Sequence, residues 1–506
     1  MQMLKNKIIL FNPRSAQWKH RIPNSILQAG ASIFGKYDFV FVDGNMESDP
    51  GMKIEGLLRT GEYKYFGCTV MPGPQLKEAV PISKKIRELF PEIVIIWGGY
   101  FASNQYKVVM ESGYVDFVIN GPGDRAFPQL LEALDHGTSC DQIGNLIYKK
   151  NGGIVITSKE ELLDQDHLPP LPYEYYNSFY PVKDYLQKTF LGNRTMGYHS
   201  SVGCPFTCSF CGIVPIYNAR WKGKSAKKMY TDVKWLKDRY GVDSIEFHDN
   251  NFFTSRSRVV EFSSLILNDN IQWWGEGRID TLDQYSDEDL QLMSNSGCRM
   301  IFLGAETGSD EVLKQMNKGG TQSAEQIKTF AVRLRRFNIV PEYSLVLGLP
   351  GENEEKVMAQ IDADIRFIRK IKKLNPDTEI IIYLYSPVPA KGSDLFEQIT
   401  RAGFEFPQTL EDWLNPSWES FDLRKNPLTP WLTPQMINKI KNFETVLNGY
   451  YPTSSDFRVS GYKRSMIRFV SWWRYKTGAY RFPFEIKILH KLWRYRQPEI
   501  EGFYGE

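Results

Sequence analysis

Ser201-Val-Gly-Cys204-Pro-Phe-Thr-Cys208-Ser-Phe-Cys211-Gly212 is the stretch around which the rest of the chain is organised. It holds three cysteines at C-x3-C-x2-C spacing, whereas the whole chain of 506 residues has only six. Thiolates this close together bind a metal or form a strained disulfide. Three thiolates are one ligand short of a closed tetrahedral site, so the spacing predicts a metal centre at Cys204, Cys208 and Cys211 with one open coordination position.

The same loop resembles the C-x3-C-x-aromatic-C loop of the radical S-adenosylmethionine (SAM) superfamily, with Phe210 in the aromatic position. The resemblance implies a [4Fe-4S] cluster in which the cysteines hold three irons and SAM chelates the fourth. The alternative is a Cys3His zinc knuckle that uses His199 as its fourth ligand. The sequence lacks the second pair of ligands that usually accompanies such a knuckle.

Composition bounds the kind of protein. A chain of 506 residues that is 42% hydrophobic and 24% charged is an ordinary globular protein, with roughly two to four domains. No apolar run approaches the roughly 18 to 20 residues of a membrane-spanning helix, and the short run 8–11 before Asn12-Pro13 indicates a strand rather than a signal peptide. Cys68, Cys140 and Cys298 are far apart, which favours reduced thiols in the cytoplasm.

Residues 1–140 alternate short β-rich runs with helical patterns. The expected strands are 7–11, 38–43, 63–70, 92–97 and 115–119. Alternation of this kind predicts a doubly wound, flavodoxin- or Rossmann-like α/β domain with a parallel sheet. Ligands of such sheets bind outside the carboxyl ends of the strands, so the loops at those ends are the expected cofactor loops.

Those loops resemble the N-terminal cobalamin-binding domain that precedes many radical SAM domains. The residues that carry this expectation are Thr69, Met71, Gly98, Gly99, Gly121 and Gly123. Small residues there let the backbone approach a flat ligand. The Asp-x-His-x-x-Gly motif by which some cobalamin proteins ligate cobalt is absent, so the resemblance implies cobalamin without a histidine ligand from that motif. A degenerate flavodoxin-like domain that binds nothing is the alternative.

Residues 141–190 are expected to form a connector, with a hairpin over 147–156 and a Pro-rich boundary at 168–172. Strand and helix patterns resume over 191–395. The expected strands are 195–202, 244–248, 272–278, 300–304, 342–347 and 379–385. Six such units predict a partial (β/α)6 barrel, the fold of radical SAM enzymes, with its chemistry on the loops at the carboxyl ends of the strands.

Polar residues follow each of these strands, and the resemblance assigns them to SAM. Asp249, Asn250 and Asn251 occupy the segment that receives the methionine amino group, with His248 where a second acid is often found. Arg278 suits the SAM carboxylate, although a plain ion pair with Asp280 is the alternative. Glu306, in a Gly-x-Glu-x-Gly pattern, is expected near the ribose and amine, and the segment at Gly348 is expected along the adenine.

The resemblance implies reductive cleavage of SAM to a 5'-deoxyadenosyl radical that attacks an unactivated carbon. The leading expectation is C-methylation of a bulky or lipid-like substrate, supported by an external reductant such as flavodoxin or ferredoxin. Relatives of the same architecture, such as the anaerobic magnesium-protoporphyrin ester cyclase and the hopanoid-pathway group, make oxidative cyclisation or ring rearrangement the second expectation. A non-catalytic metal-binding protein is the alternative from another class.

The last segment, 396–506, is expected to be a mostly helical cap. Its part 461–496 holds ten Lys or Arg against the single acid Glu485, so it carries +9 of a chain whose net charge is +3. Basic helices rich in Trp and Tyr suit the anionic inner face of a membrane, which predicts peripheral contact. Packing on the barrel with solvated Lys and Arg is the equal alternative, and no nucleic-acid partner is expected because no binding module accompanies the patch.

Overall fold

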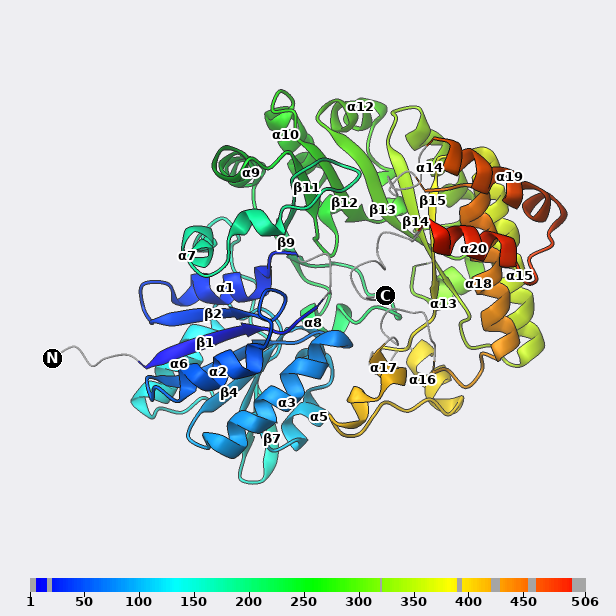
Figure 1. Ribbon diagram of the computed structural model, residues 1–506. Coiled ribbons are helices and arrows are strands. Elements are labelled where there is room, and N and C mark those ends of the chain that lie inside the picture. Colours follow the sequence, from blue (N-terminus) through cyan, green and yellow to red (C-terminus); the bar gives the residue numbers. More distant parts are fainter. Residues whose placement is uncertain are drawn as a thin grey trace.

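The computed structural model describes residues 6–15, 21–318, 321–388, 394–419, 428–453 and 461–493. Two α/β units lie side by side, and a set of helices from the last part of the chain packs on the second unit (Figure 1). The first unit is built around a seven-stranded sheet and the second around a six-stranded sheet. The predicted fold class, α/β with parallel sheets followed by a helical C-terminal region, is confirmed.

The first sheet has the strand order β2-β1-β3-β4-β5-β6-β7. Its first five strands are parallel, whereas β6 and β7 form an antiparallel hairpin on the edge. The strands are β1 (Lys7–Asn12), β2 (Phe39–Asp43), β3 (Tyr63–Thr69), β4 (Val94–Gly98), β5 (Phe117–Ile119), β6 (Leu146–Lys150) and β7 (Gly153–Ile156). All five predicted strands are therefore present, and the hairpin expected in the connector pairs with β5 and extends this sheet.

Helices cover both faces of the first sheet, as a doubly wound fold requires. On one face α1 and α6 pack against Ile8 and Leu10 of β1, and on the other α2, α3 and α5 pack against Ile9 and Phe11. The alternation of these buried residues along one strand explains its continuous apolar sequence. The helices are α1 (Asn24–Ile33), α2 (Pro50–Leu58), α3 (Pro74–Leu89), α4 (Gly99–Asn104), α5 (Tyr106–Glu111) and α6 (Ala126–His136).

A buried carboxylate joins the first sheet to the segment that leads into the barrel. Asp43, at the end of β2, is fully buried and accepts hydrogen bonds from the phenols of Tyr176 and Tyr185, the former at 2.9 Å. Its other oxygen accepts from the Asn12 amide at 2.9 Å. The two tyrosines belong to α7 (Tyr173–Asn177) and the 3-10 helix η1 (Val182–Tyr185). The connecting segment is therefore fastened to the first unit by satisfied buried polar groups.

The second sheet is parallel throughout and has the order β15-β14-β13-β12-β11-β8. Six parallel strands with helices on their outer side form the predicted partial barrel (Figure 1). The predicted first strand is divided into β8 and a separate strand, β9. The sheet strands are β8 (Thr195–Tyr198), β11 (Ser244–Phe247), β12 (Gln272–Gly277), β13 (Cys298–Glu306), β14 (Val340–Leu347) and β15 (Glu379–Leu384).

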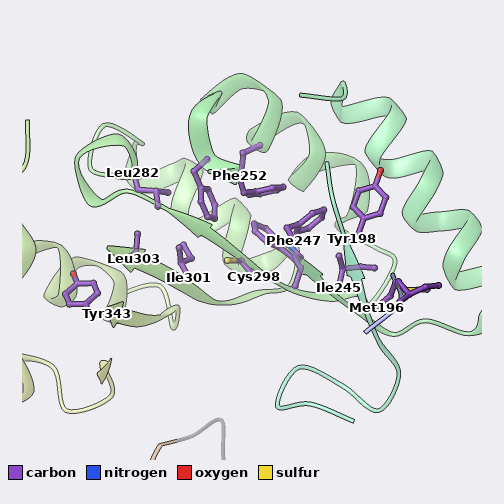
Figure 2. Close-up of a cluster of buried hydrophobic side chains, with 14 of the residues drawn as sticks. Met196, Tyr198, Ile245, Phe247, Phe252, Leu282, Cys298, Ile301, Leu303 and Tyr343 are labelled. Carbon is purple, nitrogen blue, oxygen red and sulfur yellow. The ribbon is translucent and has the colours of Figure 1, made fainter. Parts of the chain in front are cut away.

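Apolar side chains on the outer face of this sheet form its core with the surrounding helices. Figure 2 shows the rings of Phe247 and Phe252 and the side chains of Ile301 and Leu303 gathered there. Because side chains alternate along a strand, the neighbours of Ile245 and Phe247 face the barrel interior instead. The outer helices are α9 (Ala226–Tyr240), α10 (Arg256–Ile266), α12 (Asp287–Asn295), α14 (Ala324–Arg335) and α15 (Glu354–Leu374).

The C-terminal region is mostly helical, as predicted. Thr433 caps α18 by accepting from the Met436 backbone N–H, and Pro434 occupies the first helical position. Helices α18, α19 and α20 lie beside α15, on the side of the barrel away from the first sheet (Figure 1). The helices are α16 (Asp394–Arg401), η3 (Asp412–Leu414), α17 (Pro416–Glu419), α18 (Pro434–Tyr450), α19 (Tyr462–Thr477) and α20 (Phe484–Leu492). Residues 494–496 of the basic stretch lie outside the described residues.

Candidate functional site

The three clustered cysteines lie in a loop closed by a small hairpin. Strands β9 (Ser201–Gly203) and β10 (Trp221–Gly223) pair antiparallel at its base, and the short helix α8 (Val214–Tyr217) lies between them. Gly203 has φ +77° and a β-carbon added there would lie 2.1 Å from the Arg220 carbonyl oxygen. Only glycine fits this position, so the sequence itself fixes where the loop leaves β9.

None of the three cysteines forms a disulfide. Burial raises the pKa of the Cys204 thiol, and the Phe206 backbone N–H opposes that effect. Among the described residues no three His, Cys, Asp or Glu side chains converge as they would around a single ion. Thiolates that hold three corners of a cubane are separated by the width of the cluster, so they need not converge in this way.

The Arg278 guanidinium is placed directly on this loop. It follows β12 and donates from Nη1 to the Cys208 sulfur at 3.1 Å. It also pairs with both oxygens of Asp280, at 3.0 Å and 2.6 Å, and its guanidinium carbon lies 4.0 Å from the centre of the Phe206 ring. The sequence predicted a contact with the SAM carboxylate, or else an ion pair with Asp280; the ion pair is present.

The three polar residues after β11 have different surroundings. Asp249 is fully buried and accepts from the Ser200 backbone N–H at 2.6 Å and from the Ser201 hydroxyl at 2.8 Å, so it organises the chain that enters the cysteine loop. Asn250 is exposed. Asn251 is 1% exposed, and its side-chain amide lies near the Cys204 thiol. Among the described residues, neither the oxygen nor the nitrogen of this amide has a partner that meets the geometry of a hydrogen bond.

The orphaned amide of Asn251 is the observation that tests whether SAM fits. A buried amide without partners costs free energy unless a ligand supplies them, and an amide has both a donor and an acceptor for an amino acid's ammonium and carboxylate. The donor set beside Cys204 therefore fits SAM. Asp249 fits less directly, because its oxygens are engaged by Ser200 and Ser201.

At the end of β13, Glu306 has the left-handed φ of +62° and is 4% exposed. Its carboxylate pairs with the Lys318 ammonium at 2.7 Å, and Lys318 also donates to the Gly304 carbonyl at 2.5 Å. Lys318 was not predicted from the sequence, because a lysine followed by two glycines carries no periodic signal. Gly348 has φ +83°, and its carbonyl accepts from the Trp431 indole at 3.0 Å.

The expected cofactor loops of the first unit lie at the carboxyl end of its parallel strands. Gly99 has φ +90°, and a β-carbon there would lie 3.0 Å from the Thr69 hydroxyl oxygen. Gly121 has φ +114°, and Met71 is 44% exposed. The order β2-β1-β3 reverses direction at β1, which places the topological switch point, where ligands of such sheets bind, beside the loop after β3. Gly98 and Gly123 border the same edge, and this rim of small residues fits a flat cofactor.

Helix α4 and the loop at Gly121 of the first unit touch the cysteine loop and α8. The hydroxyl of Tyr100, which follows Gly99, would lie 2.1 Å from a β-carbon added to Gly212, and the Asn104 amide donates to the Gly212 carbonyl at 3.2 Å. Gly121 likewise lies against Ile216 of α8, with the Ile216 carbonyl oxygen 3.5 Å from a β-carbon added to that glycine. A cofactor at the first sheet and one at the cysteines would therefore be neighbours.

Polar residues also face the interior of the barrel, where sequence reasoning assigned none of them except His248. Glu246 pairs with Arg21 of the first unit at 3.0 Å and lies 3.1 Å from the His248 ring nitrogen. Across the sheet, the Trp274 indole donates to Glu342 at 2.9 Å. Their alternation with outward apolar residues could have indicated the inward face, but the partner on the first unit could not be read from one sequence.

Residues 198–363 match the profile of the Radical SAM superfamily. With the cysteine loop and the partial barrel in place, this match identifies a radical SAM domain over residues 198–363, and the similar methyltransferases and cyclases indicate an enzyme. An uncharacterized methyltransferase from Pyrococcus horikoshii is 25% identical over 355 residues, covering 69% of this chain and 73% of that protein. The anaerobic magnesium-protoporphyrin IX monomethyl ester cyclase of Synechocystis is 25% identical over 306 residues, covering 59% of this chain and 57% of the cyclase.

The arrangement of both units also occurs in a solved structure. The cobalamin-dependent SAM radical enzyme OxsB, solved with aqua-cobalamin and SAM bound, superposes with a TM-score of 0.68 at 14% sequence identity. The match covers 97% of this chain and 75% of OxsB. At this identity the likeness concerns the fold, including the order of sheet, barrel and helical region.

Proposed function

We propose that this protein is a cobalamin-dependent radical SAM enzyme that methylates an unactivated carbon of its substrate. The observation that carries the proposal is the contact of Tyr100 and Asn104 with Gly212, because it sets the expected cobalamin loops against the cysteine loop. Bound at these places, the cluster and SAM would supply hydrogen abstraction from carbon, and cobalamin would supply a methyl group. The fold likeness to OxsB and the relative from Pyrococcus support the same reading.

The chain's own residues would bind and orient these groups. Cys204, Cys208 and Cys211 would hold the cluster, and Asn251 would satisfy its orphaned amide on the amino-acid part of SAM. The rim formed by Thr69, Met71, Gly98, Gly99, Gly121 and Gly123 would lie along cobalamin. The rim of the first unit and the cysteine loop of the second meet at Gly212. Water would therefore be excluded from the space between the two cofactors, which favours reaction of the substrate carbon over side reactions.

An anaerobic reconstitution tests the proposal. The wild-type protein is expected to hold about four irons per chain, to cleave SAM to 5'-deoxyadenosine, and to bind hydroxocobalamin with a shifted visible spectrum. Cys208→Ala should lose the iron and the cleavage, whereas the matched control Cys140→Ala should retain both, since Cys140 lies far from the loop in sequence. About three irons or fewer without SAM cleavage would contradict the enzyme, and a failure to bind cobalamin would contradict the first unit's role.

Oxidative cyclisation is the second candidate, and the likeness to the magnesium-protoporphyrin ester cyclase favours it. Both reactions would use the same loops, so the products distinguish them. With methyl-labelled SAM, methylation transfers the label to the substrate, whereas cyclisation removes hydrogen and leaves the substrate unlabelled.

Radical SAM enzymes act on a small-molecule substrate with an external reductant, and both apply to this protein. We propose that the reductant is a flavodoxin or ferredoxin and that the substrate is bulky and lipid-like. Support for a lipid-like substrate comes from the surface of α19 and α20. Among the described helices none is both long and apolar enough to cross a membrane.

Helices α19 and α20 carry a large exposed apolar surface. On α19 the exposed side chains recur at the spacing of one helix face, opposite the buried Ile467 and Tyr475. Phe469 is 79% exposed and Leu492 is 69% exposed. The apolar members are Tyr462, Met466, Phe469, Trp472, Trp473, Phe482, Phe484, Ile488 and Leu492, and the exposed basic members are Arg468, Lys476, Arg481, Lys487 and Lys491.

We propose that an anionic membrane at the cytoplasmic face covers this surface. Charge complementarity supports that choice, because exposed basic side chains are interspersed with the exposed aromatic and aliphatic ones on the same helices, as in interfacial helices. Liposome flotation tests it with the variant Phe469→Ser/Phe484→Ser/Ile488→Ser and the control Met52→Ser, whose exposed methionine lies on α2. Wild type and control should float with vesicles that contain phosphatidylglycerol, less so at high salt, and the triple variant should not. Equal flotation of all three, or a dimer mass that the triple variant abolishes, would contradict the membrane contact.

A further inference from the structure

Arg278 uses its donors on the protein itself rather than leaving them for a ligand. Nε and Nη2 donate to the two oxygens of Asp280, Nη1 donates to the Cys208 sulfur, and Nη2 also reaches the Thr321 hydroxyl at 3.3 Å. The Arg278 side chain is 7% exposed and that of Asp280 is 5% exposed. A guanidinium with both edges engaged and its face against Phe206 has little room to form a further bidentate pair.

The position of this pair relative to the cysteine loop gives it another role. Cys208 is one of the three thiolates expected to hold the cluster, and it is the most buried of them. An N–H donor on a cluster sulfur stabilises the added negative charge of the reduced cluster, so hydrogen bonds to sulfur and nearby net charge set reduction potentials. Asp280 holds the guanidinium in place and offsets its charge.

We propose that Arg278 is a positioning residue that sets the reduction potential of the cluster through its hydrogen bond to Cys208, with Asp280 moderating its charge. The inference rests on the proposed function, since it requires a cluster at the cysteines. It differs from the assignment of Arg278 to the SAM carboxylate because its effect is present before SAM binds. The two residues also act with opposite sign: loss of the guanidinium removes positive charge beside the sulfur, and loss of the carboxylate leaves that positive charge uncompensated.

Potentiometric titration of the reconstituted cluster, monitored by electron paramagnetic resonance in the absence of SAM, tests the proposal. Arg278→Gln is expected to disfavour one-electron reduction at least tenfold, a shift of about 59 mV to more negative potential. Asp280→Asn should shift the potential in the positive direction. Arg333→Gln is the matched control, because Arg333 also pairs with carboxylates, Asp283 and Asp287, but on the outer helices, and it should leave the potential unchanged.

The opposite signs separate tuning from damage. A loosened loop would expose the cluster in both variants and shift both potentials in one direction, so shifts of the same sign would overturn the proposal. Unchanged potentials in both variants would overturn it too. A normal potential in Arg278→Gln, together with loss of the spectral change that SAM causes in the wild type, would instead assign Arg278 to SAM. If the wild-type protein assembles no cluster, the proposed function itself fails.

Discussion

The hydroxyl of Tyr100 occupies the space beside the α-carbon of Gly212, so close that a β-carbon on Gly212 would lie 2.1 Å from it. Tyr100 belongs to the first unit and Gly212 ends the cysteine loop of the second. The absence of a side chain at one position of the motif is therefore matched to the presence of a large one on the neighbouring unit. A side chain at Gly212 would therefore clash unless Tyr100 moves or is replaced by a smaller residue.

Gly212→Ala is expected to lower the free energy of unfolding by about 1 to 3 kcal/mol and to reduce iron retention, because the new methyl group displaces Tyr100 or the loop. Iron content and denaturant unfolding measure the two effects. In Gly212→Ala/Tyr100→Ala the loss should be smaller than the sum of the single variants, since the clash is relieved. Gly56→Ala, on α2 with no heavy atom within 4 Å of the added carbon, should be neutral or stabilising. Strict additivity in the double variant would contradict a direct clash.

Asp43→Ala should destabilise the whole chain. The substitution removes the acceptor shared by the Asn12 amide and by the phenols of Tyr176 and Tyr185, which remain bonded only to each other; unpaired buried groups cost about 1 to 3 kcal/mol each. We expect a loss of at least about 3 kcal/mol, measured by urea unfolding. The exposed Asp38, just before β2, serves as the control, and Asp38→Ala should have a small effect. A loss below about 1 kcal/mol for Asp43→Ala would show that the network contributes little.

Lys372 makes stability depend on pH. Burial lowers its pKa to about 7 in the folded protein, from an ordinary value of 10.5 when exposed. Between these values the unfolded state binds more protons, so its contribution to stability rises as pH increases from about 7 toward 10 and is least favourable below 7. The slope in this window approaches about 1.4 kcal/mol per pH unit for one proton.

Lys372→Met should flatten that rise in the free energy of unfolding between pH 7 and 9.5. Its absolute stability also changes, because Lys372 donates to the Pro376 and Thr378 carbonyls, so the slope is the informative quantity. Lys373→Met alters the adjacent exposed lysine and should keep the wild-type slope. Parallel pH curves for all three proteins would contradict a neutral buried lysine.

Lys318→Met should be strongly destabilising, because it leaves the Glu306 carboxylate buried without its partner; broken buried ion pairs cost about 3 to 5 kcal/mol. The double variant Lys318→Met/Glu306→Gln should recover part of the loss, since no charge then remains unpaired. Thermal unfolding of the two single variants and the double variant measures the coupling. A double variant less stable than Lys318→Met would contradict this account.

Much of this fold was predictable because strand and helix patterns are local. The five first-sheet strands, the six barrel strands, and helices such as 226–240 follow from apolar periodicity, Gly-rich turns and caps. The hairpin over 147–156 was predicted, but its pairing with β5 was not, because pairing depends on contacts distant in sequence. The first barrel strand is divided where Ser200 and Ser201 donate hydrogen bonds to Asp249, about fifty residues away in the sequence. A contact this distant could not be predicted from local patterns.

The residues of the candidate site likewise fall into those that could be predicted from the sequence and those that could not. The cysteines and the polar strand ends are motif residues and could be named from the sequence. Their partners could not, because Lys318 and Arg21 lie in loops and Tyr100 lies in the six-residue helix α4, and none of these segments carries a periodic pattern that points to the site. Arg278 illustrates the limit, since its motif position was recognised while its donors turned out to be directed at Asp280 and Cys208.

The hydrogen bonds of Tyr176 and Tyr185 to Asp43 determine which segments must stay together when domains are exchanged between related enzymes. A chimera that exchanges the first sheet of one such enzyme for another, cut at the end of residue 140, would separate Asp43 from Tyr176 and Tyr185 and leave one buried carboxylate oxygen without the donors it has here. A junction after Tyr185 keeps the cluster of hydroxyls with its acid. The smallest portable module is thus the sheet together with the segment that follows it, and swapping cofactor specificity between relatives would mean moving both as one piece.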